Sequence, residues 1–301
     1  MSDNKNVLKP CEFDLKKINL SDPSKLPKGG YMIYVNNVRS HLYMQTPKVN
    51  VLWDCKYFAD DAEGQSGKYT VQFSLTDLEN NKKMRDFYDV MASLDAYVLD
   101  AAFENRKEWF GAKFTKSTKE TLESLYTPMV KVNVDQETGE PDGKFPPRFA
   151  FKVVKRDGKH QCKLYDSEKN MFNIDDVDGE EYKSLETDVL VKGSSMNVVL
   201  KCNGIWVISG KFGCTWRAEQ IKVKVHEKAI SGYAFRDDDD DDDEDVSGVT
   251  SSVSNTVETM VQNVVNVVDD TDSDSDSGEE EASPSPAPTP VKKKRVVKKK
   301  A

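Results

Sequence analysis

The stretch from Met196 to Val225, which reads MNVVLKCNGIWVISGKFGCTWRAEQIKVKV, carries both aromatic and cationic side chains. Flat rings stack on unpaired bases, and Lys or Arg side chains neutralise phosphates, so this combination on strands favours binding of single-stranded nucleic acid. The rings and cations proposed for this role are Trp206, Lys211, Phe212, Trp216, Arg217 and Lys222.

A structural role is the alternative for the same residues. Tryptophans on strands are usually core residues, and strand lysines usually mark a solvated face. Phe212 differs from Trp206 and Trp216, because it lies in a tight turn next to a glycine, where burial is harder. The pattern alone leaves both interpretations open.

Two more segments carry rings beside cations and are added to the candidate interface. The added residues are Trp53, Lys56 and Tyr57 from one segment, and Phe151, Lys152, Lys163 and Tyr165 from the other. Neighbouring residues on a strand point to opposite faces, so some of these rings must be core.

Two dipeptides predict the turns that position these residues. Asn203-Gly204 and Asp157-Gly158 each separate two β-branched or aromatic runs, and both are favoured in two-residue type I′ hairpins. A second turn at Ser209–Gly213 leads into the last run, so the Met196–Val225 stretch is predicted to be a three-strand meander.

The rest of the body is predicted to be strands interrupted by one long helix. Alternating or β-branched runs predict strands at YMIYVN, KVNVLWDCKYF, KYTVQFSL and PMVKVNV. Apolar residues at spacings of three and four predict a helix from Asp77 to Arg106, with its capping box at Thr76–Glu79. A short helix at Lys119–Leu125 follows, and the fold class is mainly β (α+β).

The charge is divided unevenly along the 301 residues. Residues 236–301 hold 8 Lys+Arg and 18 Asp+Glu, which leaves 43 − 8 = 35 cations and 52 − 18 = 34 acids in residues 1–235. We therefore expect a flexible arm at 1–28, a folded domain at 29–235 with a helical insertion at about 77–125, and a disordered tail at 236–301.

The tail contains three kinds of sequence. Residues 237–281 are acidic, residues 283–290 are rich in proline, and residues 292–300 are basic. The basic end is a candidate nuclear import signal, or a nucleic-acid contact, formed by Lys292, Lys293, Lys294, Arg295, Lys298, Lys299 and Lys300.

The sequence lacks the motifs of metal sites, disulfide frameworks, common enzymes and membrane spans. The five cysteines form no CxxC pair and there are three histidines, so we expect no metal site, no disulfide framework and no cofactor. The sequence has no P-loop, GxGxxG, HExxH or GxSxG motif, so we expect no enzyme. No apolar run approaches the ~18 residues of a membrane span, so we expect no membrane contact and an intracellular location.

The segment NVVLKCNGIWVISGKFGCTWRAEQIKV resembles the closing strands of the single-stranded DNA-binding proteins of large eukaryotic (nucleocytoplasmic) DNA viruses. The likeness lies in an Asn-Gly dipeptide, a GKFG turn and a Trp-x-x-x-Gln-x-x-Val strand. It implies an oligonucleotide-binding (OB) fold, that is an antiparallel β-barrel with an inserted helix. It also implies non-sequence-specific binding of single strands in viral DNA replication, recombination and repair. The basic end departs from the acidic tail that is common in this functional class.

These observations predict a binder of single-stranded DNA, with RNA left open as a second ligand. The acidic tail is expected to modulate binding or to recruit replication and recombination proteins, in the host nucleus or in a cytoplasmic viral replication factory. The alternative is an acidic-tailed chaperone of histones or other basic proteins, imported into the nucleus, in which the Asp run is the binding site and the rings are core.

Overall fold

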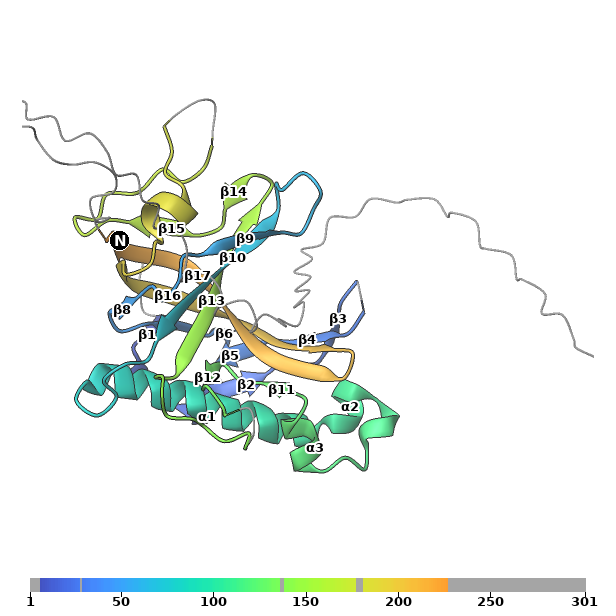
Figure 1. Ribbon diagram of the computed structural model, residues 1–301. Helices are drawn as coiled ribbons and strands as arrows, with labels where there is room; N and C mark the ends of the chain where they lie inside the picture. Colours follow the sequence, from blue (N-terminus) through green and yellow to red (C-terminus); the bar gives the residue numbers. More distant parts are fainter. Residues whose placement is uncertain (1–5, 28, 136–137, 177–180, 227–301) are drawn as a thin grey trace, which may run out of the picture.

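The structure is a computed structural model that describes residues 6–27, 29–135, 138–176 and 181–226 (Figure 1). The long strands are β10 (Gly67–Ser74), β13 (Arg148–Arg156), β16 (Ser195–Ile208) and β17 (Lys211–Lys224). The shorter strands are β1 (Val7–Leu8), β2 (Ile18–Leu20), β3 (Ser24–Lys25), β4 (Tyr31–Ile33), β5 (Val35–Asn37), β6 (Ser40–His41), β7 (Tyr43–Gln45), β8 (Val49–Asn50), β9 (Lys56–Ala59), β11 (Tyr126–Thr127), β12 (Val130–Lys131), β14 (Lys159–His160) and β15 (Lys163–Tyr165). The helices are α1 (Lys82–Glu104), α2 (Arg106–Phe110) and α3 (Lys119–Glu123), so the expected mainly β fold with a helical insertion is confirmed.

One large sheet organises the described chain. Its strand order is β1-β7-β16-β17-β13-β10-β9, and β4 and β8 also pair with β16. The sheet remains open between β1 and β9. A single isolated bridge, Val51 to Phe73, connects the residue after β8 to β10, next to a hydrogen bond of 2.9 Å from the Leu52 N–H to the Gln72 carbonyl. The described strands therefore do not form a fully closed barrel.

Over residues 195–203 of β16 and 215–224 of β17, the long hairpin has one buried face and one solvent-facing face, whereas both faces are covered nearer its turn. In β16, Met196, Val198, Leu200 and Cys202 alternate with partly exposed residues and point into the core. Alternation of this kind is typical of an antiparallel sheet with one face against the core. We call the opposite, solvent-facing side of the main sheet the outer face.

Helix α1 packs along the core side of the sheet, with α2 and α3 close to its C-terminal end (Figure 1). Its Phe87 ring lies 5.9 Å from the Phe73 ring of β10 and 5.3 Å from the Phe149 ring of β13, centroid to centroid. The predicted apolar stripe of this helix is confirmed, because Met84, Phe87, Met91, Leu94, Val98 and Ala101 are all buried.

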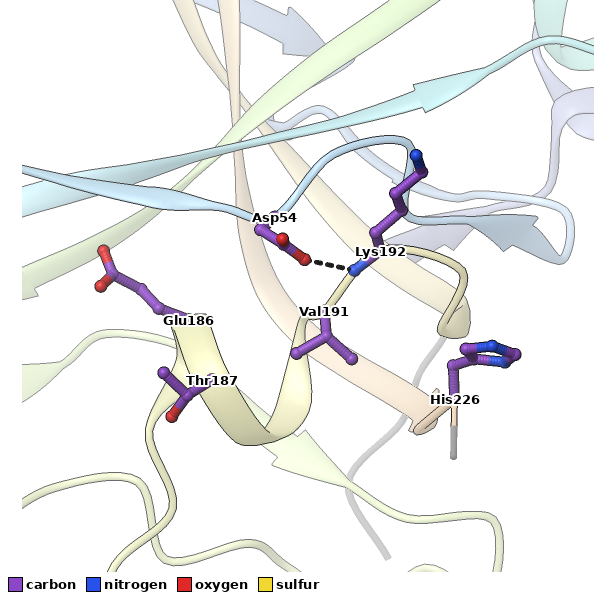
Figure 2. A pocket seen from close by; sticks show the side chains of 6 residues that line it. All are labelled: Asp54, Glu186, Thr187, Val191, Lys192 and His226. Atoms are coloured by element: carbon purple, nitrogen blue, oxygen red, sulfur yellow. Dashed lines mark hydrogen bonds between the residues drawn. The ribbon is translucent and has the colours of Figure 1, made fainter. Parts of the chain in front are cut away.

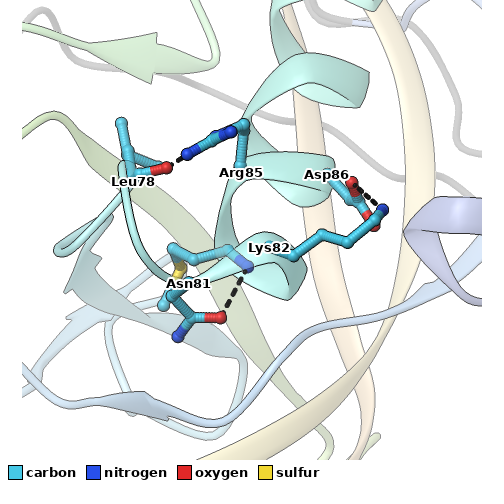
Figure 3. Close-up of polar contacts among 6 residues, drawn as sticks. Leu78, Asn81, Lys82, Arg85 and Asp86 are labelled. Carbon is cyan, nitrogen blue, oxygen red and sulfur yellow. Dashed lines mark hydrogen bonds and ion pairs between the residues drawn. The ribbon is translucent and has the colours of Figure 1, made fainter.

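The start of α1 differs from the predicted capping box at Thr76–Glu79. Asn81 caps the helix, its side chain accepting the Met84 N–H at 3.2 Å, and the Arg85 Nε donates to the Leu78 carbonyl at 2.7 Å (Figure 3). Asp77 has a positive φ of 57°, so the chain turns at Asp77 and the helix begins only at Lys82.

The interpretation of Asn203-Gly204 as a hairpin turn is wrong. β16 runs without a break from Ser195 to Ile208, and the chain reverses instead at Ser209-Gly210, where both residues have positive φ. Gly204 lies at an irregularity in the register, and a Cβ at this position would come 2.5 Å from the Ile33 carbonyl oxygen. The glycine therefore permits close approach of β4, and the stretch is a two-strand hairpin rather than a three-strand meander.

The Asp157-Gly158 turn is confirmed. β13 and β14 pair through Lys155 with His160 and Arg156 with Lys159, and both turn residues have positive φ. The short helix predicted at Lys119–Leu125 is present as α3, whereas α2 was not predicted.

The N-terminal segment is more ordered than the expected flexible arm. Within residues 6–27, β1 pairs in parallel with β7, and β2 pairs with β5 in a small second sheet formed by β2, β5 and β6. The acidic tail and the basic end, for which the sequence makes separate predictions, lie outside the described residues.

Candidate nucleic-acid interface

A row of polar and aromatic side chains crosses the outer face, perpendicular to the strands. Directly paired residues on neighbouring strands point to the same side of a sheet, so the strand registers define the row. In order from β7 to β9, the paired residues are Tyr43, Lys201, Arg217, Lys152, Thr70 and Lys56. We call this set the cross-strand row. At about 4.8 Å between strands, its five spacings extend roughly 24 Å.

Rings cluster at the β7 end of the cross-strand row. The centroid of the His41 ring lies 6.5 Å from that of Tyr34 and 6.4 Å from that of Tyr43, both in edge-to-face geometry. The Lys201 ammonium lies 5.9 Å from the centroid of the Tyr43 ring. Tyr34 is 41% exposed, so this ring cluster and the adjacent cations share a solvent-facing surface.

The charges in the row act on one another. Burial first, and then Lys201 and Arg217, lower the pKa of His41 below its usual 6.5, while Glu219 raises it. The Arg217 Nε donates to Glu219 at 2.9 Å, so one carboxylate lies within the basic row. His41 is therefore an electrostatic neighbour of the same two cations that the strand register places beside Tyr43.

A second group of predicted residues lies further along β17. β15 pairs with β17 so that Lys163 stands opposite Gln220 and Tyr165 opposite Lys222, while Leu164 is buried between them. Lys163, Tyr165 and Lys222 thus lie on the outer face, and their role in binding stays a prediction.

Four of the predicted stacking rings are core residues instead. Trp216 and Phe151 are each 1% exposed, Phe212 is fully buried and Trp206 is 4% exposed. The Trp216 indole N–H donates to the Met129 sulfur at 3.0 Å, and the Phe212 ring packs 5.1 Å from that of Phe110.

Alternation explains the burial of Trp216 and Phe151. Trp216 precedes Arg217 and Phe151 precedes Lys152, so when the cations face outwards the rings must face the core. Phe212 is buried because α2 and β11 cover the end of the hairpin, which a short turn motif does not reveal.

The remaining predicted residues are not gathered with the cross-strand row. Lys211 is exposed at the hairpin turn, six residues from Arg217 and so about 20 Å away along β17. The Tyr57 ring lies 4.9 Å from the Tyr69 ring, on the side of β9 opposite Lys56. Trp53 is 50% exposed, with the Lys192 ammonium 5.5 Å from its ring centroid.

A shallow pocket next to Trp53 has mixed charge. Its volume is about 330 Å³, and it is lined by Asp54, Glu186, Thr187, Val191, Lys192 and His226 (Figure 2). The Lys192 backbone N–H donates to Asp54 Oδ1 at 2.7 Å, and Glu186 Oε1 accepts the Tyr57 N–H at 2.6 Å. Both carboxylates therefore already hold backbone N–H groups.

The sequence did not lead us to include Tyr34, His41 and Tyr43 in the candidate interface, whereas Lys201 belongs to the cationic stretch from Met196 to Val225. The run SHLYMQ does carry a signal, because His41 and Tyr43 alternate with Leu42 and Met44, which are both fully buried. A period of two over six residues indicates a strand with one polar face. The strand was overlooked because β6 and β7 are only two and three residues long.

We searched the described residues for a metal site and for a membrane-spanning helix. Within the described residues, no three His, Cys, Asp or Glu side chains come together as a metal site. None of the helices described here is long and apolar enough to cross a membrane.

The fold and the outer face define a mainly β protein whose open sheet presents cations beside rings. Over residues 73–237 the sequence matches the family described as "Family of unknown function (DUF5871)", and the chain belongs to that family. No curated protein matches the sequence.

Two solved structures are distantly similar. The single-stranded DNA-binding protein of bacteriophage T7 aligns with a TM-score of 0.37 at 13% identity, covering 64% of this chain and 91% of that chain. The single-stranded DNA-binding protein of bacteriophage Enc34, in complex with single-stranded DNA, aligns with a TM-score of 0.35 at 10% identity, covering 70% and 98%. Similarity at this level assigns neither a fold nor a function to the present chain.

Proposed function

We propose that the protein binds single-stranded DNA, without sequence specificity, across the outer face of its main sheet. The observation that supports this most directly is the cross-strand row, in which Lys201, Arg217 and Lys152 follow one another next to the Tyr34–His41–Tyr43 ring cluster. Cations track phosphates and rings stack on bases, and neither contact selects one base over another.

The strand circuit is consistent with an OB-type barrel. Neighbouring strands pair in the order β8, β16, β17, β13 and β10, and β13 runs parallel to β17. The Val51–Phe73 bridge then connects β10 to the residue after β8, where the series began. OB folds are partly open five-stranded barrels that bind oligonucleotides on the face of their second and third strands. In this assignment β10 and β13 are those strands, and they contribute Thr70 and Lys152 to the cross-strand row.

A body that is nearly neutral in net charge implies moderate affinity that depends on local clustering of cations. Each phosphate neutralised by Lys or Arg releases condensed counterions, so affinity should fall steeply as salt rises. We propose that this binding serves DNA replication, recombination and repair of a large DNA virus, as the resemblance of the β16–β17 segment implies.

The acidic tail is proposed to regulate the same surface. Asp237–Asp245 presents closely spaced carboxylates that mimic a phosphate backbone, and it competes for the outer face when DNA is absent. The second role proposed for this run is docking of a basic replication protein. The basic end at 292–300 is proposed as a nuclear import signal, which fusion of Pro290–Ala301 to a fluorescent protein would test.

The decisive experiment compares two charge-matched double variants. Lys201→Gln with Arg217→Gln removes two cations from the outer face, whereas Lys83→Gln with Lys116→Gln removes two exposed cations outside it. Fluorescence anisotropy with a labelled oligothymidine should show weaker binding and a smaller salt slope for the first pair only. Equal affinities for both variants and the wild type would remove the outer face from the proposal.

A further inference from the structure

Two cysteines lie in the core directly beneath the outer face. Cys202 on β16 is 2% exposed and Cys214 on β17 is 9% exposed. Neither cysteine takes part in a disulfide, and their sulfur atoms are 3.4 Å apart. A disulfide bond measures about 2.05 Å, so the two sulfurs need to approach by only roughly 1.4 Å to form one.

The register explains both the closeness and the remaining gap. Cys202 is paired with Trp216 and Cys214 with Ile205, so the cysteines are diagonal neighbours with a register irregularity between Cys202 and Gly204. Diagonal backbone positions are typically about 7–8 Å apart, somewhat more than the usual span of a disulfide. A bond here requires a small shift of the strands and is therefore easily reduced.

We propose that Cys202 and Cys214 form a reversible cross-strand disulfide, with a small disulfide such as oxidised glutathione as the oxidant. The Cys214 thiolate attacks one sulfur of the oxidant, forms a mixed disulfide and releases one thiolate. The Cys202 thiolate then displaces the second thiolate, and the two protons lost by the cysteines end on the released thiols. The protein dithiol is oxidised and the small disulfide is reduced to two thiols.

The pair is mechanically connected to the ring cluster. The Cys202 N–H donates to the Leu42 carbonyl at 2.9 Å, and Leu42 lies between His41 and Tyr43. The Lys201–Arg217 pair is the next register position after Cys202–Trp216. Drawing the strands together therefore displaces both rings and cations of the outer face, and, resting on the proposed function, oxidation lowers affinity for single-stranded DNA.

The test maps the bond in the full-length protein. After incubation with oxidised glutathione, free thiols are blocked with N-ethylmaleimide and the unreduced digest is analysed by mass spectrometry. We expect a peptide pair joined through Cys202 and Cys214, lighter by two hydrogens and separated again by dithiothreitol. In Cys202→Ala the same treatment should leave glutathione attached to Cys214.

A second incubation in dilute urea, below the unfolding transition, opens the hairpin transiently and gives the oxidant access to the buried thiols. Absence of the joined peptide in both incubations would overturn the proposal, as would a stable glutathione adduct at Cys214 in the wild-type protein.

Oligonucleotide binding by the reduced and oxidised forms separates this inference from the proposed function. A several-fold loss of affinity on oxidation, absent in Cys202→Ala, supports the link to the outer face. A mapped disulfide with unchanged affinity overturns that link while the disulfide itself stands. If neither form binds the oligonucleotide, the proposed function fails, and the peptide map alone decides the inference.

Discussion

Lys152 on β13 stands directly opposite Arg217 on β17, at the point where these two strands meet in parallel. Like charges placed opposite each other destabilise a sheet. Lys152 is only 8% exposed, so water screens this repulsion incompletely. Glu219, which accepts a hydrogen bond from the Arg217 Nε at 2.9 Å, offsets part of this repulsion. An anionic ligand at the middle of the cross-strand row would offset more of it.

Replacing Lys152 with Met separates these two effects. Lys152→Met keeps the apolar stem and removes the charge, so we expect an equal or higher melting temperature together with weaker binding to single-stranded DNA. Thermal unfolding and an oligothymidine titration on the same sample would measure both quantities. A lower melting temperature with unchanged affinity would mean that Lys152 serves the fold.

Ring contacts and charge contacts should differ in their response to salt. Tyr43→Leu should cost about 1–3 kcal/mol of binding free energy per stacked base and leave the salt slope unchanged. Lys201→Gln should reduce the salt slope by about 1. Titrations at four salt concentrations would resolve the two variants.

The matched control for the ring is Phe145→Leu, because Phe145 is 63% exposed and lies outside the paired strands that form the cross-strand row. This variant should bind like the wild type. Equal losses for Phe145→Leu and Tyr43→Leu would count against specific stacking at the β7 end of the row.

His41 predicts a pH dependence of DNA binding. Burial, Lys201 and Arg217 lower its pKa in the free protein, and a nearby phosphate favours the protonated ring. Binding therefore takes up a proton, and affinity should rise as the pH falls from about 8 to about 5, by at most about tenfold per pH unit. In His41→Gln the profile should flatten, and an unchanged profile would exclude His41 as its source.

The stability of the free protein should change in the opposite direction. Because the pKa of His41 is lower in the folded chain than its usual 6.5, the unfolded chain binds the proton first as pH falls. His160 contributes with the same sign, because burial and, to a smaller extent, Lys155 lower its pKa despite the opposing effect of Asp175. Urea unfolding at several pH values should therefore show stability lost below about pH 6.5, and less of that loss in His41→Gln.

The placement of Trp216 in the core can be tested by stability measurements alone. Trp216→Ala should lose about 3–5 kcal/mol of unfolding free energy, whereas Trp216→Phe should lose less. Below its melting temperature, Trp216→Phe should bind single-stranded DNA with wild-type affinity. A large loss of affinity at unchanged stability would restore Trp216 as a stacking residue.

The sequence predicted the positions of helices, strands and turns better than it predicted which face of each strand is buried. Local signals located the Asp157-Gly158 turn, the apolar stripe of α1 and the alternation in β10, because each depends on neighbouring residues. The hairpin prediction at Asn203-Gly204 was wrong because the sequence does not distinguish a turn glycine from a glycine that allows the Ile33 carbonyl to approach closely. The solvent-facing side of β17 is determined by packing against α1, β11 and β13, which are distant in sequence. The local pattern alone therefore could not show that Trp216 faces the core and Arg217 faces solvent.

The tail prediction concerns the competition between Asp237–Asp245 and DNA. Truncation after Arg236 removes the acidic run and the basic end together, so a second, longer truncated protein that ends at Pro290 isolates the basic end. If the acidic run covers the outer face, the protein that ends at Arg236 should bind single-stranded DNA more tightly, with the largest gain at low salt. Removal of the basic end alone should not reproduce that gain.

Binding assays with histones on the full-length and truncated proteins test the chaperone alternative. Under the proposed function, the protein truncated after Arg236 retains DNA binding through Lys201, Arg217 and Lys152. Under the alternative, the full-length chain binds histones, truncation abolishes that binding, and the outer-face cations are dispensable. Weaker DNA binding after truncation would show that the tail assists the interface, because removing a competitor for the outer face can only increase the free surface available to the strand.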